Sequence, residues 1–435
     1  MKTADRLDAF AIVLAGIAAV NCAIFPYFME KASIRVPVDD LLDWLQFYGD
    51  RMAAGDWLGY LWTPHNEHRI VISRILLALD VRWFGGGGTA FVLCGAVLLL
   101  GMFAAIGGEI VKSDLPRSWK LAAFALVILL LAPTHIVDTL GMPVLDGFVQ
   151  TAAFALFSII LQGGETEHLV SLRRFATLVA ACLASFGVAA GLLIWPVLVW
   201  AAWRGRLHMP WIALLACVGG VWIFAYMRHL PLNSVASPYD FNRLALAFDY
   251  AIRFLGLPWS HLHALVWPSR AVGLAILILG CFALIRESVS ARPGTRLQRL
   301  GLALVLFSFL AAGSAALARV DVAVDREMPI RYGMFADLAQ VGLLLWALDY
   351  LRRLSARQHG RVLQWGLVGL SAVWLGQQLA VGQFAIAEAH RYNDAWARFV
   401  SGAWTPDMLH YVYPDPDRAR AELAHVRAMG LYKGK

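Results

Sequence analysis

The sequence is poor in charged residues. Asp, Glu, Lys and Arg make up 15% of its 435 residues, whereas soluble domains carry about 25%. It also has no acidic or basic tail and no low-complexity tract. Hydrophobic residues account for 60% of the chain, and the mean hydropathy is +0.62. These values exclude an ordinary soluble domain and predict a protein that crosses a membrane several times.

The sequence is also short of cysteine motifs. Its five cysteines all lie inside apolar runs, and no two of them form a CxxC pair. We therefore expect them to be small core residues rather than a disulfide or zinc framework.

Long apolar runs are what the sequence does have. Windows of roughly 20 apolar residues predict about eleven membrane spans. The first follows MKTADR and is expected to stay uncleaved, because no small-x-small site comes after it. We therefore expect an all-α integral membrane protein, with a transmembrane bundle over 1–386 and a short tail over 387–435. The expected spans cover residues 8–27, 88–110, 119–136, 147–162, 172–187, 189–203, 209–227, 267–286, 299–318, 333–352 and 363–386.

The distribution of Lys and Arg predicts the orientation of these spans. A net charge of +7 would suggest a nucleic-acid partner in a soluble protein. Here the basic residues gather in the short loops after every second span, so no nucleic-acid partner is expected. Loops of this kind stay in the cytoplasm, which places the N-terminus inside and the C-terminus outside. The loops 28–87, 134–146, 228–266 and 319–332 then share the outer face.

One outer segment, residues 37–74, concentrates polar and aromatic residues, with five aspartates and the run HNEHR at 65–69. We expect an amphipathic helix over 39–53 that lies on the membrane surface. A second interfacial helix is expected from Glu67 to Trp83, since its charges would be costly inside the bilayer. A tail helix between Pro414 and Gly430 is expected to pack on the outer loops.

Two adjacent carboxylates, Asp39 and Asp40, begin the first of these helices. Burial near lipid and a neighbouring negative charge both raise the pKa of a carboxyl group. A carboxylate with a raised pKa suits a general base that takes a proton from a hydroxyl. The alternative is that one aspartate caps the helix and the other is solvated. Asp43 lies on the same helical face as Asp39.

The run His65-Asn66-Glu67-His68-Arg69 places two imidazoles, a carboxylate and a guanidinium within five residues. His65 and His68 would share a divalent metal if the run were helical, although the spacing is not the HExxH of zinc proteases. We favour a hydrogen-bonded network that orients a sugar or a phosphate. The alternative is a polar loop at the level of the lipid headgroups.

A third polar cluster lies late in the chain, where a span starts from the outer face. Arg331 and Tyr332 begin this span, and an Arg at headgroup depth can bind a lipid phosphate with two hydrogen bonds. The alternative is an interfacial anchor. The other charged residues of the cluster are Arg319, Asp321, Asp325, Arg326 and Glu327. Further outer cations are too scattered to assign: Arg228, His229, Arg243, Arg253, His261, His263 and Arg270.

In their order along the chain, these motifs resemble the GT-C superfamily of polytopic membrane glycosyltransferases, in particular its bacterial branch. The shared pattern is one span, an outer loop with early aspartates and W-x-P-H-N-E-H-R (62–69), and a late Arg-Tyr that enters a span. Gly191–Arg206 also matches the Gly-Leu-x-x-x-Pro span of this branch. Two motifs differ: the 134–150 loop offers Asp138 where the family often has Glu, and Ile330 replaces a Ser.

The resemblance implies an enzyme of the bacterial inner membrane that acts on its periplasmic face. Such enzymes move a sugar from a polyprenyl-phosphate donor to a hydroxyl of a glycan, a lipid or a protein. Their base is an aspartate of the first outer loop, which maps to Asp40, or else to Asp39. Arg331 and Arg319 are expected at the donor phosphate. Many relatives need no metal, and some bind a divalent one. The other residues expected to contact substrate are Asp43, His65, Asn66, Glu67, His68, Arg69, Arg74, Asp138 and Tyr332.

Two other functions remain as alternatives, a transporter or flippase of a lipid-linked saccharide and a non-catalytic scaffold. A transporter should carry acidic or interrupted spans near the middle of the bilayer. These spans are nearly free of charge at their centres, and the polar residues gather on one face. The glycosyltransferase hypothesis further expects Asp39 or Asp40, Glu67 and Arg331 to converge on one outer cavity.

Overall fold

Helices make up most of the computed structural model. No strand occurs in the part of the chain that it describes, where an isolated β-bridge joins His65 to His68. The predicted all-α class is therefore confirmed. The described residues are 8–34, 36–38, 40–131, 142–163, 171–230, 241–259, 266–291, 293–323, 328–356, 360–403, 405, 408, 413 and 415–432.

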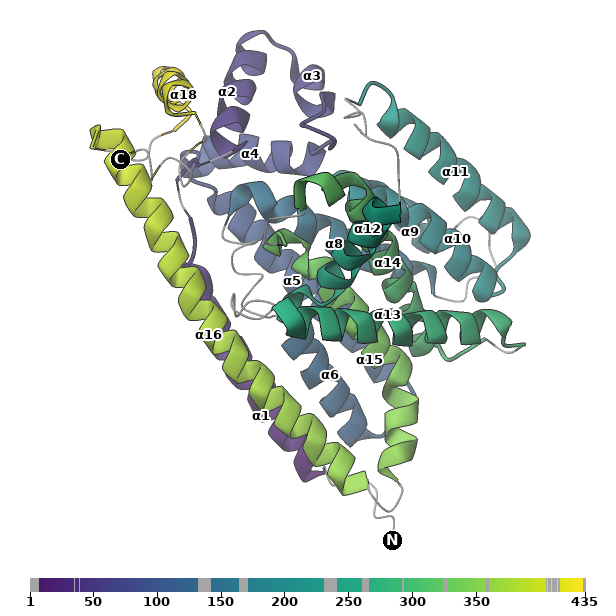
Figure 1. Cartoon of the computed structure of the whole chain (residues 1–435). Helices are drawn as coiled ribbons and strands as arrows, with labels where there is room; N and C mark the ends of the chain where they lie inside the picture. Colours follow the sequence, from purple (N-terminus) through teal and green to yellow (C-terminus); the bar gives the residue numbers. More distant parts are fainter. Residues whose placement is uncertain are drawn as a thin grey trace.

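Figure 1 shows how these helices are arranged, with α1 and α16 side by side along one edge of the bundle. The α-helices are α1 (Ala9–Lys31), α2 (Asp40–Ala53), α3 (Trp57–Trp62), α4 (Val71–Phe84), α5 (Thr89–Lys112), α6 (Arg117–Leu131), α8 (Asp146–Gln162), α9 (Leu172–Ser185), α10 (Ile194–Arg204), α11 (Met209–Met227), α12 (Phe241–Leu255), α13 (Val266–Val289), α14 (Arg296–Ala323), α15 (Gly333–Ser355), α16 (Gly360–Ser401) and α18 (Pro416–Ala428). Short 3₁₀ helices are η1 (Pro143–Leu145), η2 (Ala189–Leu193), η3 (Leu257–Trp259) and η4 (Ile330–Tyr332).

Each predicted span coincides with helix over the residues that the structure describes. Among the described residues, seven helices are long and apolar enough to cross a membrane: α1, α5, α8 with η1, α11, α13, α14, and α15 with η4. The segment Ala189–Arg204 is apolar but shorter. The last predicted span ends inside α16, which continues without a break to Ser401.

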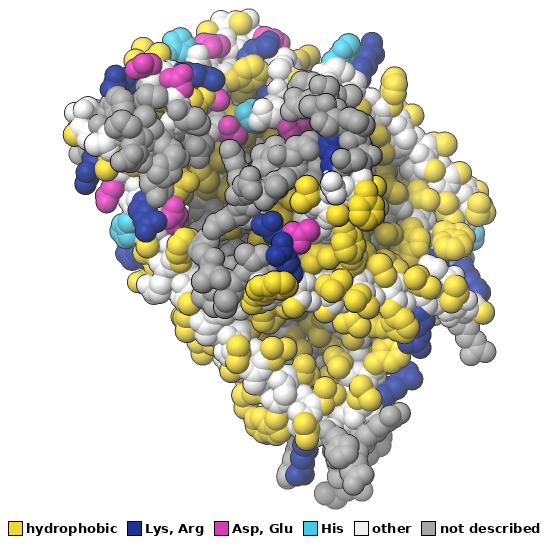
Figure 2. All heavy atoms as spheres, viewed as in Figure 1, with side chains coloured by type: hydrophobic (Ala, Val, Ile, Leu, Met, Phe, Trp, Pro, Cys, Tyr) yellow, Lys and Arg dark blue, Asp and Glu magenta, His cyan; other side chains and the backbone are white. Residues whose placement is uncertain are grey.

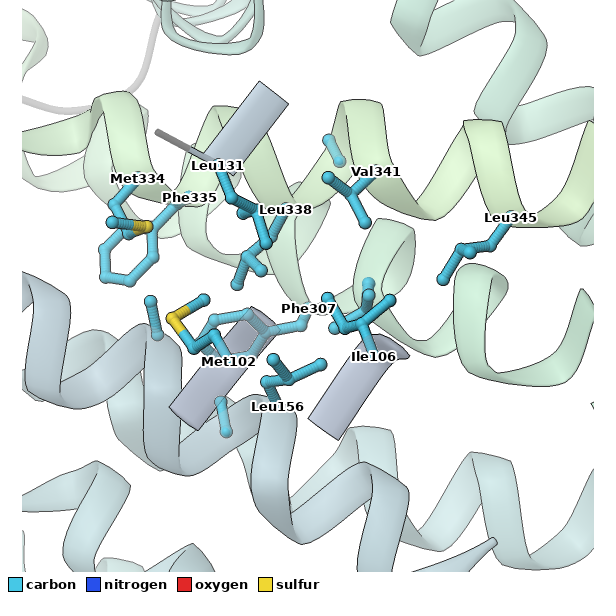
Figure 3. Close-up of a cluster of buried hydrophobic side chains, with 14 of the residues drawn as sticks. Met102, Ile106, Leu131, Leu156, Phe307, Met334, Phe335, Leu338, Val341 and Leu345 are labelled. Carbon is cyan, nitrogen blue, oxygen red and sulfur yellow. The ribbon is translucent and has the colours of Figure 1, made fainter. Parts of the chain in front are cut away.

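The largest hydrophobic core joins α5, α6, α8, α14 and α15 (Figure 3). On α15 the buried residues Met334, Leu338, Val341 and Leu345 are spaced by four, three and four positions. This spacing places them on one face of a helix. That face lies against Phe307 of α14 and its neighbours, so α15 occupies the centre of the bundle.

The polar outer segment folds into α2, α3 and α4 at one end of the bundle, next to α18 and the end of α16 (Figure 1). The expectation that the apolar face of α2 lies on the membrane surface is wrong, because that face packs against other helices of the protein. Leu41 and Leu45 are 1% and 0% exposed, and they belong to a second core shared with Phe399 and Leu423. The prediction that the tail helix packs on the outer segment is confirmed, because α18 contacts α2.

Two glycines bring α14 and α15 unusually close. A Cβ atom added at Gly301 would meet the carbonyl oxygen of Gly342, and one added at Gly342 would meet that of Gly301. Small residues at a crossing let two helix backbones approach closely within a membrane bundle. The packing of α14 on α15 therefore depends on the absence of a side chain at both positions.

We predict that Gly301→Ala destabilises the protein by about 1–3 kcal/mol, because overpacking forces the two backbones apart. Gly313→Ala is the matched control, since it lies on the same helix and a Cβ there meets nothing within 4 Å. Thermal unfolding in detergent should show a lower melting temperature for Gly301→Ala alone. Equal melting temperatures for the two variants would contradict the close crossing.

Candidate functional site

Charged and histidine side chains gather at the end of the molecule formed by α2, α3 and α18, whereas hydrophobic side chains cover the visible flank of the bundle (Figure 2). This end contains the segment that the sequence singles out. The described residues of that segment can therefore be placed one by one.

The run 65–69 forms a tight hairpin rather than the start of a helix. His65 N–H donates to the carbonyl of His68 over 2.8 Å, and His68 N–H donates back over 2.9 Å. Asn66 at the tip has a φ of 50°, in the left-handed region. The predicted helix from Glu67 is wrong in its start, since α4 begins only at Val71. The two imidazoles consequently do not share a helical face.

Arg69 fastens this hairpin to α11. Arg69 is buried, with 2% of its surface exposed. Nε donates to the carbonyl of Tyr226 over 2.9 Å and Nη2 to that of Arg228 over 2.5 Å. Nη1 donates to the carbonyl of Trp62. Burial lowers the pKa of the guanidinium. Arg69 is therefore directed at backbone carbonyls rather than at the outer cavities.

Arg74 has a similar environment on α4. It is 4% exposed, and its Nη1 donates to the carbonyls of Tyr60 and Thr63. The hydroxyl of Tyr60 donates to the carbonyl of Arg74 over 2.8 Å. Burial lowers the pKa of Arg74 to about 10, against the opposing influence of Tyr60. The second arginine thus holds α3 against α4.

Asp40 is the first residue of α2, and its side chain is 51% exposed. Its Oδ2 lies 3.3 Å from Nε2 of His65. That hydrogen bond lowers the pKa of Asp40, and the charge of Arg331 lowers it further, although partial burial opposes both. The raised pKa expected for this carboxyl group is therefore wrong, because two cationic or donor groups outweigh desolvation. The neighbouring Asp39 lies outside the described residues.

The Nε2 atom of His65 has two competing partners. Trp44 Nε1–H lies 3.2 Å from it and can donate only when Nε2 carries no proton. The carboxylate of Asp40 accepts from the same atom only when Nε2 is protonated. The state of His65 thus decides whether Asp40 receives a hydrogen bond. Asn66 Nδ2, at 3.4 Å, is a further neighbour of this nitrogen.

Glu67 and His68 point toward the bundle and meet α14. The carboxylate of Glu67 pairs with Arg319, a residue 252 positions further along the chain. His68 Nδ1 accepts from the N–H of Ala189 over 3.2 Å, so its proton resides on Nε2, which lies 3.8 Å from Glu67 Oε1. Burial lowers the pKa of His68 to about 4, helped by Arg319 and opposed by Glu67. His68 is therefore neutral and presents an N–H donor near neutral pH.

These residues form the rim of an apolar cavity of about 420 Å³. Its polar lining comes from Glu67, His68, Ser314, Arg319 and Tyr332. Its walls are hydrophobic side chains of η2, α10, α11, α14 and α15. They include Val188, Leu192, Leu193, Pro196, Ile223, Met227, Ala311, Ala315 and Phe335. The cavity thus combines a charged rim with a hydrophobic interior.

Arg331 lies beside this rim. Its guanidinium carbon is 5.6 Å from the ring centre of Tyr332 and 6.0 Å from that of Phe148. It is close enough to Asp40 to lower the pKa of that carboxyl group. The start of α2 and the start of α15 are therefore neighbours. Of Asp40, Glu67 and Arg331, which were expected to converge on one outer cavity, only Glu67 lines this one.

Asp43 is engaged by the tail. Tyr413 donates its hydroxyl proton to Asp43 over 2.9 Å, and Arg418 Nη2 lies 3.0 Å from the same carboxylate. A second, polar cavity of about 450 Å³ opens here between α2, α3 and α18. Both His65 and Trp44 line it. The sequence offered no signal for the tail residues, because the contact joins positions 370 and 375 apart.

Several other expected site residues lie outside the described part of the chain. They are Asp138, Asp325, Arg326, Glu327, His261 and His263, and the side chain of Asp321. Of the scattered outer cations, Arg270 is bound to Asp249 by two hydrogen bonds of 2.7 and 2.8 Å.

The described residues do not fit a divalent metal. They contain no group of three or more His, Cys, Asp or Glu side chains that could hold an ion. In addition, His68 Nδ1 already accepts from Ala189, and His65 Nε2 already faces Trp44 and Asp40. We therefore derive no step through a metal.

No protein-family model matches the chain, and no curated protein matches it. Among solved structures, the chain is similar to the crystal structure of ArnT from Cupriavidus metallidurans in the apo state. The two are 16% identical with a TM-score of 0.41, and the match covers 96% of this chain and 75% of that chain. At this level of similarity we draw no conclusion about activity from the match.

We predict that His68 makes the protein less stable in acid. Its pKa is about 4 in the folded protein, against 6.5 for an exposed imidazole. The unfolded chain therefore binds a proton more readily as the pH falls from 6.5 to 4, and up to about 3 kcal/mol of stability is lost over that window. The melting temperature should fall between pH 7.5 and pH 5, and the fall should shrink in His68→Gln. An undiminished fall in this variant would contradict the prediction.

Proposed function

We propose that this chain is a membrane glycosyltransferase of the GT-C type, which transfers a sugar from a polyprenyl-phosphate donor to a hydroxyl acceptor at the outer end of the bundle. One observation carries the proposal. The charge of Arg331 acts on a half-exposed carboxylate, Asp40, and Arg331 directly precedes Tyr332, which lines an apolar cavity with a charged rim. A ligand with a sugar phosphate head and a hydrocarbon tail needs this combination.

The donor would bind with its tail in the apolar cavity and its phosphate at the rim. Hydrocarbon walls favour an isoprenoid chain. Arg331 would bind the phosphate through paired hydrogen bonds. Arg319 is already paired with Glu67, so it adds a second, partly neutralised cation. Tyr332, which lines the cavity next to Arg331, would separate the head from the tail.

Asp40 would act as the base. It accepts the proton of the acceptor hydroxyl while that oxygen bonds to the anomeric carbon. The bond from this carbon to the phosphate oxygen breaks, and the phosphate leaves with the electron pair. Arg331 stabilises the charge that develops on the leaving phosphate. A lowered pKa makes Asp40 a weak base, so proton transfer is expected late, when the sugar carbon already carries positive charge.

Five further residues would have supporting roles. Glu67 would accept a hydrogen bond from a sugar hydroxyl, and neutral His68 would donate one through Nε2. His65 would orient the carboxylate of Asp40. Arg69 and Arg74, bound to backbone carbonyls, would hold the hairpin in place rather than contact the donor.

The positions of buried acids in the candidate spans favour surface chemistry over transport. Among the described residues these acids are Glu109, Asp146, Glu287 and Asp337, and each lies within five residues of an end of its helix. A transporter would be expected to place such groups near the middle of its spans.

We predict that Asp40→Asn lowers sugar transfer by at least a hundredfold, since an amide cannot take up the hydroxyl proton. The assay follows release of polyprenyl phosphate from synthetic polyprenyl-phosphate sugars in the presence of a membrane lipid extract. Asp50→Asn is the matched control, because Asp50 lies on the same helix and pairs with His425 of the tail. Equal activity of both variants would remove Asp40 from the proposed mechanism.

Arg331→Ala should weaken binding of polyprenyl phosphate alone by about tenfold to a hundredfold, the loss expected for a charge-assisted pair. Calorimetric titration in detergent measures this affinity. Arg391→Ala serves as control, since its side chain is 57% exposed on α16 and pairs with Glu388. If the two variants bind equally well, Arg331 does not contact the phosphate.

A further inference from the structure

A separate cavity of about 260 Å³ lies at the opposite end of the bundle, among residues of α5, α8, α10 and α14. The path of α14 shows how far it is from the candidate site. The span runs from Arg296 at this cavity to Arg319 at the outer rim over 24 residues, which corresponds to about 34 Å. This cavity has no part in the chemistry proposed above.

The charge around the cavity is predominantly positive. Glu109 is bound by Arg296 through two hydrogen bonds, of which the one from Nη2 measures 2.9 Å. Lys112 lies 3.4 Å from the same carboxylate. Arg299 also lines the cavity, and Arg173 lies within electrostatic reach of Arg296. Among the described residues that line the cavity, two cations, Arg296 and Arg299, thus stand against one carboxylate, Glu109, which leaves one positive charge in excess.

The side chain of Gln162 indicates that a ligand of this cavity should carry a hydrogen-bond donor. The residue is 6% exposed and lines the cavity. Its Nε2 donates to the carbonyl of Leu198 over 2.7 Å. Its Oε1 is buried and has no hydrogen-bond partner within the described chain. A buried acceptor of this kind costs about 1–3 kcal/mol unless a donor reaches it, so a ligand that fills the cavity should carry a hydroxyl or another donor.

The remaining walls are hydrophobic, and they include Ile159, Ile160, Leu207 and Leu300. The cavity also lies where the candidate spans α5, α8 and α14 end or begin. Lipid headgroups occupy this depth in a membrane. A lipid therefore satisfies the apolar walls, which a free inorganic phosphate would not.

We propose that this cavity binds the headgroup of an anionic phospholipid that carries a hydroxyl group. Its phosphate is held by Arg296 and Arg299, and its headgroup hydroxyl donates to Oε1 of Gln162. The acyl chains follow the apolar wall formed by Ile159 and Leu300. The site is independent of the glycosyltransferase function, and binding is measured without any transfer assay.

Two lipids of equal charge and equal acyl chains test this proposal on the delipidated full-length protein in detergent. Phosphatidylglycerol has headgroup hydroxyls, whereas phosphatidylmethanol has none. We expect phosphatidylglycerol to bind about fivefold to tenfold more tightly, the difference that one hydrogen bond to a buried acceptor gives. Native mass spectrometry and the shift in melting temperature with lipid concentration both report the affinity.

Two variants separate the contributions of Gln162 and Arg299 to lipid binding. Gln162→Met should remove the preference for phosphatidylglycerol, and Arg299→Gln should weaken both lipids while it keeps the preference. Equal affinities of the wild type for both lipids would overturn the proposal, as would a preference that survives in Gln162→Met. Competition by millimolar inorganic phosphate would show that the site takes a free anion and would also overturn it.

Discussion

One buried guanidinium, that of Arg69, holds the outer segment of this protein on its membrane bundle. A buried charge costs several kcal/mol unless hydrogen bonds satisfy it. The acceptors here are three backbone carbonyls, one from Trp62 and two from the end of α11. Because the α11 acceptors are 157 and 159 positions away along the chain, the charge is satisfied only when the hairpin is seated. Seating the hairpin is what directs Glu67 and His68 toward the apolar cavity.

The rim of that cavity separates two kinds of electrostatic environment. Glu67 and Arg319 neutralise each other, and His68 is kept neutral by burial. The interior side of the rim therefore carries little net charge, which suits a hydrocarbon tail. The side chain of Asp40 is half-exposed, so water screens its charge, and Arg331 acts on it electrostatically. A ligand with one polar and one apolar end would be oriented by this difference before any specific contact forms.

Features that depend on neighbours along the chain were predictable. Apolar runs located the helices of the bundle, and a Pro-Asp start with a terminal Gly located α18, whose Asp415 accepts from two backbone N–H groups. Features that depend on distant residues were not. The start of α4 was predicted wrongly because the left-handed backbone of Asn66, at the tip of the hairpin, does not change the spacing of apolar residues in the sequence. The pKa direction of Asp40 was missed because His65 and Arg331 reach it only in the folded chain. The sequence likewise does not show whether the side chain of an Arg faces a ligand or a backbone carbonyl. For Arg69 and Arg74, the folded structure was needed to decide this.

The glycine contact between α14 and α15 bears on the distance between Arg319 and Arg331. Arg319 ends the span of α14 and Arg331 stands at the entrance to α15. With the two backbones pressed together at Gly301 and Gly342, the helices tilt and slide only as a pair. The gap between the two guanidiniums is then set by a crossing near the opposite end of α14. Widening that gap would call for a new helix geometry, whereas changes confined to the surface loops would leave it as it is.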